Sequence, residues 1–114
     1  MTTDTIETPT TIAPPHIDNV QVRHLLTAGI YMKVYRAPKG MQVRTKRFDL
    51  DHAFILAQGS AVIKTDLEEI KLKAPVVYNI PAHTRMAAFT LEDSVWYCIH
   101  RTEETDLEQL AEKY

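Results

Sequence analysis

From residue 20 onward, hydrophobic and polar residues alternate mostly with a period of two, which is the pattern of half-buried β-strands. In one such stretch, Ile30, Met32 and Val34 alternate with the residues between them. Further strands are predicted within 43–48, 53–56, 60–64, 70–73, 76–80, 86–89 and 95–99. Turn signals such as Pro38-Lys39-Gly40 separate them. Many short strands with frequent turns predict an all-β sandwich or barrel.

The two ends of the chain depart from this pattern. Residues 1–19 are rich in Thr and Pro and have no apolar period, which predicts a flexible or partner-bound N-terminal arm. Thr105 and Glu108 fit a capping box at the start of a short amphipathic C-terminal α-helix. The predicted division is an arm at 1–19, a β-barrel at 20–104 and a helix at 105–114.

Composition limits the function classes. A chain of 114 residues with 45% hydrophobic residues can bury one sizeable core. The 13 Lys+Arg and 15 Asp+Glu give a net charge of −2, which argues against a dedicated binder of nucleic acid or of anionic membranes. The single cysteine, Cys98, excludes an internal disulfide framework. Since we see no membrane-spanning run and no signal peptide, we expect a soluble protein of a reducing cytosol.

Three stretches together resemble the cupin family: Pro38-Lys39-Gly40, the block 54–63 around Gly59, and Ile80-Pro81-Ala82-His83-Thr84. The resemblance covers about residues 30–100 and implies a double-stranded β-helix, the RmlC-like jelly-roll barrel. The sequence is most similar to small single-domain cupin-like proteins of tailed bacteriophages and prophages. Those often end in a similar acidic helix after a segment like the one at 91–96 and His100.

The resemblance also implies where a cupin would hold a metal. The spacing of the family's first motif fits Gly40–Gly59 and places Lys46, Phe48 and His52 at ligand positions, while the second motif places Met86 there. A protonated lysine has no lone pair, a phenylalanine has no donor atom, and a thioether suits only soft metals. Because three of four ligands are replaced, we expect no metal, except at His52 if a degenerate site exists, and no cofactor. We therefore favour a protein that is not an enzyme.

Arg44, Lys46 and Phe48 share parity, and the geometry of the cupin family implies that they point into the barrel. A lysine there is unfavourable unless an anion pairs with it. One hypothesis is therefore a small anionic ligand held by Arg44, Lys46 and His52. In the alternative interpretation, Lys46 extends to the barrel mouth or pairs with an acidic side chain, and His52 is a core or pocket histidine satisfied by a hydrogen bond.

Aromatic side chains on strands are the candidates for a protein interface. Tyr31 and Tyr35 would serve as anchors if they face outward, because aromatic residues are enriched at binding hot spots. The hydrophobic face of the C-terminal helix would add Leu107, Leu110 and Tyr114. Cys98 is expected to be an inert thiol in the core.

Two function classes remain open. We favour a non-enzymatic structural or binding protein, encoded by a phage, that acts as a virion-associated or assembly module. Its partners would be further copies of itself and other phage or host proteins, with no nucleic acid or membrane. It would reside in the cytoplasm of the bacterial host or in the virion. The alternative is a barrel pocket that binds a small anionic ligand or serves a metal-dependent cupin enzyme.

Overall fold

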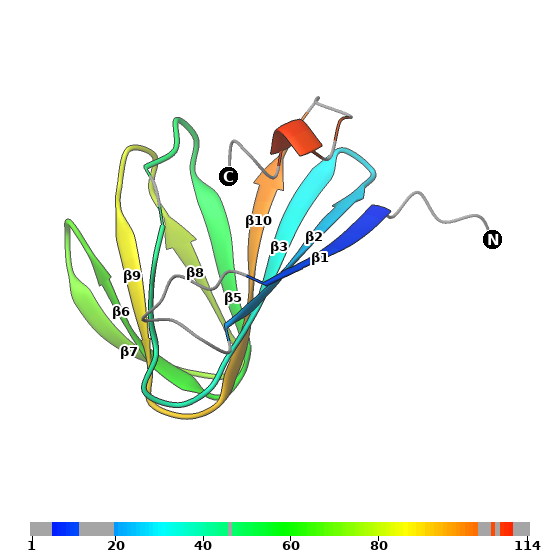
Figure 1. Ribbon diagram of the computed structural model, residues 1–114. Coiled ribbons are helices and arrows are strands. Elements are labelled where there is room, and N and C mark those ends of the chain that lie inside the picture. Colours follow the sequence, from blue (N-terminus) through cyan, green and yellow to red (C-terminus); the bar gives the residue numbers. More distant parts are fainter. Residues whose placement is uncertain (1–5, 12–19, 46, 103–105, 107, 111–114) are drawn as a thin grey trace.

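The computed structural model describes residues 6–11, 20–45, 47–102, 106 and 108–110 (Figure 1). As the sequence predicts, β-strands dominate this part of the chain. They are β1 (Ile6–Thr11), β2 (Gln21–Thr27), β3 (Ile30–Ala37), β4 (Gln42–Arg44), β5 (His52–Gln58), β6 (Ser60–Thr65), β7 (Glu69–Lys73), β8 (Val76–Ile80), β9 (Met86–Thr90) and β10 (Ser94–Arg101). Among the described residues, no helix is long and apolar enough to cross a membrane.

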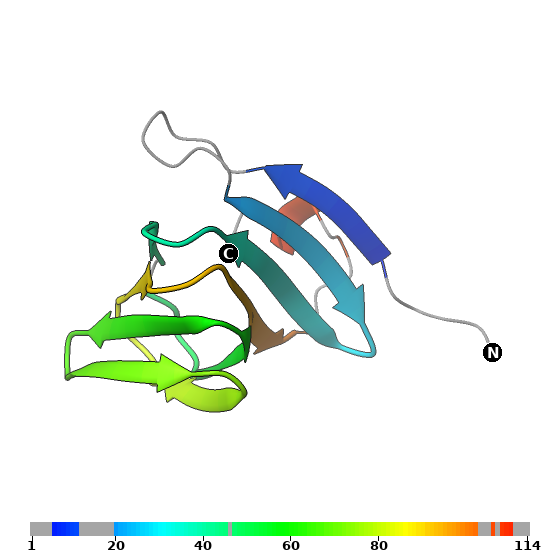
Figure 2. The same ribbon diagram turned by 90° about the horizontal axis from the view of Figure 1, so that it is seen from below.

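The strands form two antiparallel sheets that face each other. Sheet A has six strands in the order β1-β2-β3-β10-β5-β8, and sheet B has four in the order β4-β9-β6-β7. Seen along the strands, sheet A extends beyond sheet B on the side of β2 and β1 (Figure 2). Non-consecutive neighbours such as β3 and β10 bring distant parts of the chain side by side. The predicted all-β class is therefore confirmed.

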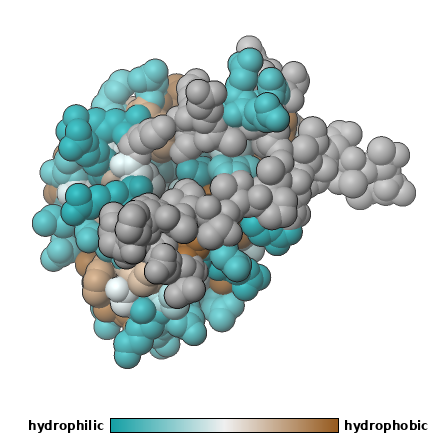
Figure 3. Space-filling view, viewed as in Figure 1, coloured by the Kyte–Doolittle hydropathy of each residue, from teal (hydrophilic) through white to brown (hydrophobic). Residues whose placement is uncertain are grey.

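The hydrophobic core lies between the two sheets. Alternate residues of each strand point inward, so Phe54 and Leu56 of β5 and Trp96 of β10 are fully buried against Ile63 and Ala88 of sheet B. Cys98 belongs to the same cluster, as predicted for a core thiol. In the view of Figure 3, hydrophilic residues cover most of the described surface, and hydrophobic ones show in smaller patches between them.

The lower end of the molecule in Figure 1 is closed by turns that bond to one another. The Thr90 hydroxyl donates to the Pro38 carbonyl oxygen at 2.6 Å, and the Lys39 amide donates to the Asp93 carboxylate at 2.9 Å. Gly59 has φ +90, and a Cβ there would lie 2.4 Å from the Asp93 carbonyl oxygen. Only glycine fits this position without a shift of the backbone.

The two ends of the chain are described in part. Residues 6–11, which the sequence places in the arm, form β1, and β1 pairs with β2 of the same chain. At the other end, residues 108–110 are helical, and the Glu108 amide donates to the Asp106 carboxylate at 2.9 Å. The predicted cap Thr105 lies outside the described residues. Leu110 is buried against Leu26 and Tyr31, so this helical turn packs on the barrel.

The facing of β3 corrects one prediction. Tyr31 and Tyr35 are 0% and 3% exposed and point into the barrel, so they are not outward-facing interface anchors. Met32 and Val34, which alternate with them, lie on the outer side of sheet A and are half-buried. Of the predicted helical contacts, Leu110 is buried within its own chain, whereas Leu107 and Tyr114 lie outside the described residues. The outward side of β3 carries Ile30, Met32, Val34 and Arg36 instead.

Candidate binding site at the polar end of the barrel

Polar side chains gather on the inner face of sheet A at the upper end in Figure 1. The antiparallel registers place His24 opposite Lys33, Lys33 opposite Cys98, and Tyr31 opposite His100. Because inward positions recur every second residue, all five side chains lie on one face. His52 begins β5 at the same level, opposite Ile80 of β8. Strands from all along the chain thus contribute to one polar cluster.

His52 and His100 are the centre of this cluster. They are 4% and 5% exposed, and their rings stack with centroids 4.6 Å apart at an interplanar angle of 27°. The Phe48 ring meets both edge-on, at 5.3 Å from His52 and 5.0 Å from His100. The two imidazoles are therefore held by aromatic packing rather than by an ion pair between them.

Tyr31, His24 and Lys33 continue the cluster across β3 and β2. The Tyr31 hydroxyl lies 2.5 Å from Nδ1 of His24, and the Tyr31 ring is 6.0 Å from that of His100. Lys33 is only 8% exposed, and its ammonium lies 5.2 Å from the centre of the Tyr35 ring. A buried ammonium over an aromatic face is stabilised in part by the electrostatic attraction of the ring. Lys33 thereby brings a positive charge into the interior.

Burial and this charge keep the histidines neutral. Desolvation lowers the pKa of His52 to about 4, although Asp51 raises it in part, and Lys33 lowers it further. Desolvation, His52 and Lys33 together lower the pKa of His100 to about 3. The pKa of His24 is lowered by burial and by Lys33. At neutral pH each ring therefore offers one donor and one acceptor nitrogen.

The segment between β4 and β5 holds Phe48 over the two imidazoles. The His83 amide donates to the Phe48 carbonyl oxygen at 2.7 Å, and the Ala82 amide donates to the Asp51 carboxylate at 2.8 Å. Both bonds come from the connection between β8 and β9. Together they hold the backbone around Phe48 against the β8–β9 connection.

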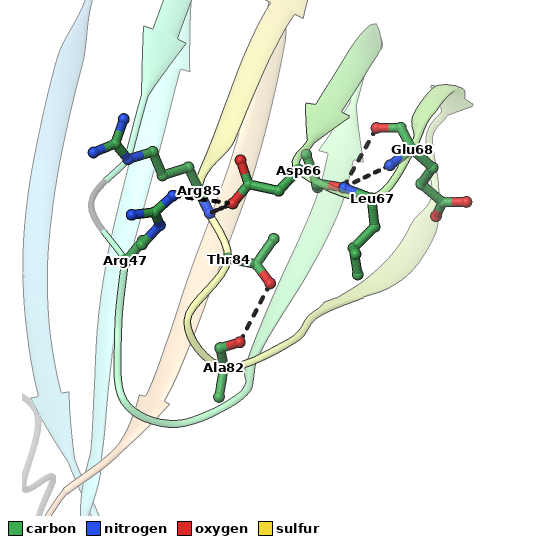
Figure 4. Close-up of polar contacts among 8 residues, drawn as sticks. Arg47, Asp66, Leu67, Glu68, Ala82, Thr84 and Arg85 are labelled. Atoms are coloured by element: carbon green, nitrogen blue, oxygen red, sulfur yellow. Dashed lines mark hydrogen bonds and ion pairs between the residues drawn. The ribbon is translucent and has the colours of Figure 1, made fainter.

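Asp66 anchors the same segment from the β6–β7 turn (Figure 4). Its carboxylate lies 3.7 Å from the Arg47 guanidinium and accepts from the Arg85 amide at 3.1 Å. The turn itself is ordered by Thr65, whose hydroxyl oxygen accepts from the amides of Leu67 and Glu68 at 3.1 Å each. Three connections of the barrel therefore meet beside Phe48.

A cavity of about 280 Å³ opens next to this cluster. Phe48 and His100 form part of its wall, and its charged lining residues include both arginines and aspartates. The remaining lining residues are Arg47, Asp49, Leu50, Asp51 and Arg101. The volume is close to the lower end of the range for small-molecule sites.

His52 stands out because neither of its buried ring nitrogens has a hydrogen-bond partner within the described part of the chain. Buried polar atoms are nearly always hydrogen-bonded, and leaving one unpaired typically destabilises a protein by about 1–3 kcal/mol. Among the described residues nothing supplies the hydrogen bond that the alternative interpretation expects for His52. Such an orphaned group beside a cavity is a candidate contact for a ligand.

The described residues do not fit a metal centre of the cupin type. No group of three or more His, Cys, Asp or Glu side chains among them is arranged to hold a metal ion. The stacked rings of His52 and His100 also keep their nitrogen lone pairs in nearly parallel planes, whereas metal ligands converge on one point. Of the other motif positions, Phe48 packs edge-on against both imidazoles, and Met86 belongs to the hydrophobic core at 2% exposed.

The predicted ligand set is only partly brought together. His52 faces inward, as the family geometry implies. Arg44 does not, because Val43 is the buried residue of the short strand β4 and Arg44 is exposed on the outer side of sheet B. Lys46 lies outside the described residues. The inward cation of the described interior is Lys33, a residue that the sequence analysis did not select.

Sequence reasoning also missed His24 and His100. The sequence did contain a signal for His100. It lies on the same side of its strand as Trp96 and Cys98, which are in the core. No comparable signal marked Lys33, since the residues that flank it in β3 are the more hydrophobic set. Only the pairing of β3 with β10 places Lys33 inside.

No protein-family model and no curated protein matches this sequence. Solved structures do match its fold. A cupin superfamily protein from Desulfitobacterium hafniense DCB-2 has 22% identity and a TM-score of 0.66, over 75% of this chain and 80% of that one. KdgF from Halomonas sp. has 16% identity and a TM-score of 0.67, over 82% and 87%. The cupin domain of Schizosaccharomyces pombe Cnp3 has 15% identity and a TM-score of 0.64, over 84% and 72%. The predicted double-stranded β-helix is thus confirmed, since the chain shares the jelly-roll fold of these structures.

Proposed function

We propose that this cupin-fold domain binds a small anionic ligand at the polar end of its barrel and does not transform it. The observation that carries the proposal is His52, whose two buried ring nitrogens lack hydrogen-bond partners among the described residues. A ligand that reaches His52 would satisfy one of them. The gain is large in a buried site, because an unpaired polar group there is unfavourable.

The surroundings of His52 define the class of ligand. Lys33 contributes a positive charge that acts on both His52 and His100. Phe48, Tyr31 and His100 present ring surfaces. The chemistry therefore suits a compact molecule with a carboxylate or similar anionic group and a flat apolar body. It would enter through the cavity beside Phe48 and His100 and displace the Phe48 ring from His52.

Binding without transformation fits the chemical groups present. The one thiol, Cys98, is protonated at neutral pH, because burial raises its pKa to about 12. The buried imidazoles are neutral, but the buried residues described include no carboxylate that could orient one of them as a general base. The cluster offers hydrogen bonds and positive potential, which are the requirements of a binding site.

Benzoate is a suitable first probe, because it combines a carboxylate with a flat ring. Titration of benzoate into protein labelled in its histidine rings should shift the NMR signals of His52 and His100. The signals of His83, an exposed ring 4.0 Å from the Asp49 carboxylate, should shift less than those of the two buried rings. Benzyl alcohol should bind more weakly, since it lacks the charge. Equal shifts of all three rings, or none at millimolar benzoate, would overturn the proposal.

A second proposed role is the virion-associated or assembly module of a phage, working through contacts between copies and with other phage or host proteins. The similarity of residues 91–96 and His100 to phage-encoded cupin-like proteins supports the phage origin. The apolar outer side of sheet A supports the protein contacts. Detection of the protein in purified particles by mass spectrometry would support this role. Its presence only in the soluble fraction of infected cells would contradict it.

A further inference from the structure

The outer side of sheet B, which faces away from sheet A in Figure 2, combines exposed cations with an exposed aromatic ring. Phe89 of β9 is 45% exposed there, and among the exposed large hydrophobic side chains of the described residues it alone has an aromatic ring. Four cations on three strands of the sheet are exposed as well. They are Arg44 of β4, Lys64 of β6, and Lys71 and Lys73 of β7. We call this surface the basic face.

The strand registers arrange the basic face around Phe89. One row across the four strands consists of Gln42, Phe89, Val62 and Lys71. The next row consists of Arg44, Ala87, Lys64 and Glu69. The residues between these rows, such as Val43 and Ala88, are buried, so both rows lie on the outer side. Phe89 is therefore diagonal to Arg44 and to Lys64, at a spacing that long side chains bridge.

The cations of the basic face are not neutralised by the described part of the chain. None of the four forms an ion pair with a carboxylate there, although Glu69 lies opposite Lys64 in the register. This surface is thus positive, whereas the whole chain has a net charge of −2. Positive charge around an apolar centre offers a partner both electrostatic complementarity and a contact for a hydrophobic side chain.

Protection of the sheet from aggregation does not account for the basic face. Lysines on an edge strand such as β7 keep a sheet soluble, and a single exposed hydrophobic residue is ordinary. However, Lys64 and Phe89 lie on β6 and β9, the two interior strands of sheet B, which have no free edge to protect. Phe89 also has Val62 and Ala87 beside it, so the uncharged centre extends over three residues.

We infer that the basic face binds a short acidic segment of another protein. One hydrophobic side chain of that segment packs on Phe89. Carboxylates on either side of it pair with Arg44 and Lys64 in one direction and with the lysines of β7 in the other. The inference goes beyond both proposed roles and depends on neither, since it requires neither an occupied barrel nor a virion.

An acidic segment fits the basic face better than a nucleic acid does. A nucleic acid is a long polyanion and would extend past the four cations, over a chain whose net charge is negative. A segment of a few residues contacts the basic face alone. The occupant we infer is therefore a protein, and nucleic acid is an outcome that the experiment must separate from it.

Binding of a labelled peptide to the full chain tests the inference. The probe is a fluorescent peptide of seven residues, with tryptophan at its centre and glutamate elsewhere. Fluorescence anisotropy at low salt should give a Kd on the order of 100 µM, as expected for a small interface, and added salt should raise the Kd by screening. A peptide with lysine in place of glutamate should not bind. One with glycine in place of tryptophan should bind more weakly.

Variants on the two sheets locate the contact. Arg44→Glu should raise the Kd for the peptide by about tenfold, because it replaces an attraction by a repulsion. Arg36→Glu, the same change at an exposed position on the outer side of sheet A, is the matched control and should leave the Kd nearly unchanged. Phe89→Ala should weaken binding, whereas Val77→Ala, at a position 67% exposed on sheet A, should not. All four positions are exposed, so the variants should fold, which circular dichroism checks.

Three results would overturn the inference. The first is that the peptide does not bind to the wild-type chain. The second is an equal loss of binding in Arg44→Glu and Arg36→Glu, which would show that the peptide responds only to overall charge. The third is tighter binding of a single-stranded deoxythymidine oligonucleotide, or of phosphatidylglycerol vesicles, than of the peptide at the same salt concentration.

Discussion

The inner face of sheet A has two regions of opposite character on the same strands. At the lower end, the rings of Tyr35 and Trp96 stack with centroids 5.2 Å apart, and the centroids of Trp96 and Phe54 are 5.9 Å apart. All three rings lie within the hydrophobic core. One or two inward positions further along the strands, Lys33 and His100 take the place of such residues. The apolar end holds the sheets together by burial. The polar end fills the barrel with groups whose burial is unfavourable, as expected if that end is the proposed ligand site.

The ends also differ in how their connections are satisfied. At the lower end, polar groups of the turns hydrogen-bond to one another. The Thr90 hydroxyl, for example, donates to the Pro38 and Met41 carbonyl oxygens. At the upper end, the connections hold Phe48 in place, but His52 beneath it stays unpaired among the described residues. The Trp96 Nε1 in the core is also without a partner among the described residues, so the ends differ in degree, with two unpaired buried nitrogens at His52 and one at Trp96. Variants at each end should therefore have opposite effects on stability.

The largest effect is expected at the apolar end. Leu56→Ala removes a fully buried side chain from the core between the sheets. It should lower the free energy of unfolding by about 2–5 kcal/mol, through lost burial and the cavity left behind. Urea denaturation followed by tryptophan fluorescence measures this. Val77→Ala, at a position 67% exposed, is the control and should change stability far less. A loss below about 0.5 kcal/mol for Leu56→Ala would contradict the contrast between the two ends.

A smaller effect is expected from acid at the polar end. His52 has its pKa lowered from 6.5 to about 4 in the folded chain, by burial first. The unfolded chain therefore binds more protons below pH 6.5, so stability is retained at neutral pH and falls as the pH drops toward 4. At about 1.4 kcal/mol per unit, His52 alone contributes a loss on the order of 3 kcal/mol. His100, with its pKa lowered to about 3, adds to this loss over the same window.

Urea denaturation between pH 7 and pH 4 checks the acid effect. His52→Leu should flatten the dependence on pH, because the titrating group is gone. Val77→Ala, which removes no titrating group and lies at an exposed position, should leave it as steep as in the wild type. Equal stability at pH 7 and pH 4.5 would show that the histidines are not kept neutral by burial.

Much of the fold could be predicted from the sequence, because alternation along single strands is a local signal. Cys98 is assigned to the core on this basis, and the structure confirms it and buries Trp96 of the same parity as well. Alternation failed where both faces of a strand carry hydrophobic residues. In β3, Tyr31 and Tyr35 point inward while Met32 and Val34 form part of an outer apolar face, so the pattern does not reveal which set is buried. For this reason the sequence suggested Tyr31 and Tyr35 as interface anchors, although both are buried.

The candidate site was harder to predict than the fold. Arg44 was expected inside because parity was carried over from the cupin motif, but Val43 takes the inward position in β4. The stacked pair His52 and His100 comes from strands far apart in sequence that both lie in sheet A. Pairing of this kind depends on long-range register, which no local pattern specifies. The ligand-binding role of Arg44, Lys46 and His52 as a set stays a prediction.

The central claim is that His52 is kept for binding at the expense of stability, and His52→Leu tests it most directly. Measured on one sample at pH 7, this variant should be more stable than the wild type by about 1 kcal/mol, because an unpaired polar group is replaced by an apolar one of similar size. In the same sample, the affinity for benzoate should be lost. A variant that is destabilised by several kcal/mol, or that binds benzoate as well as the wild type, would contradict the account.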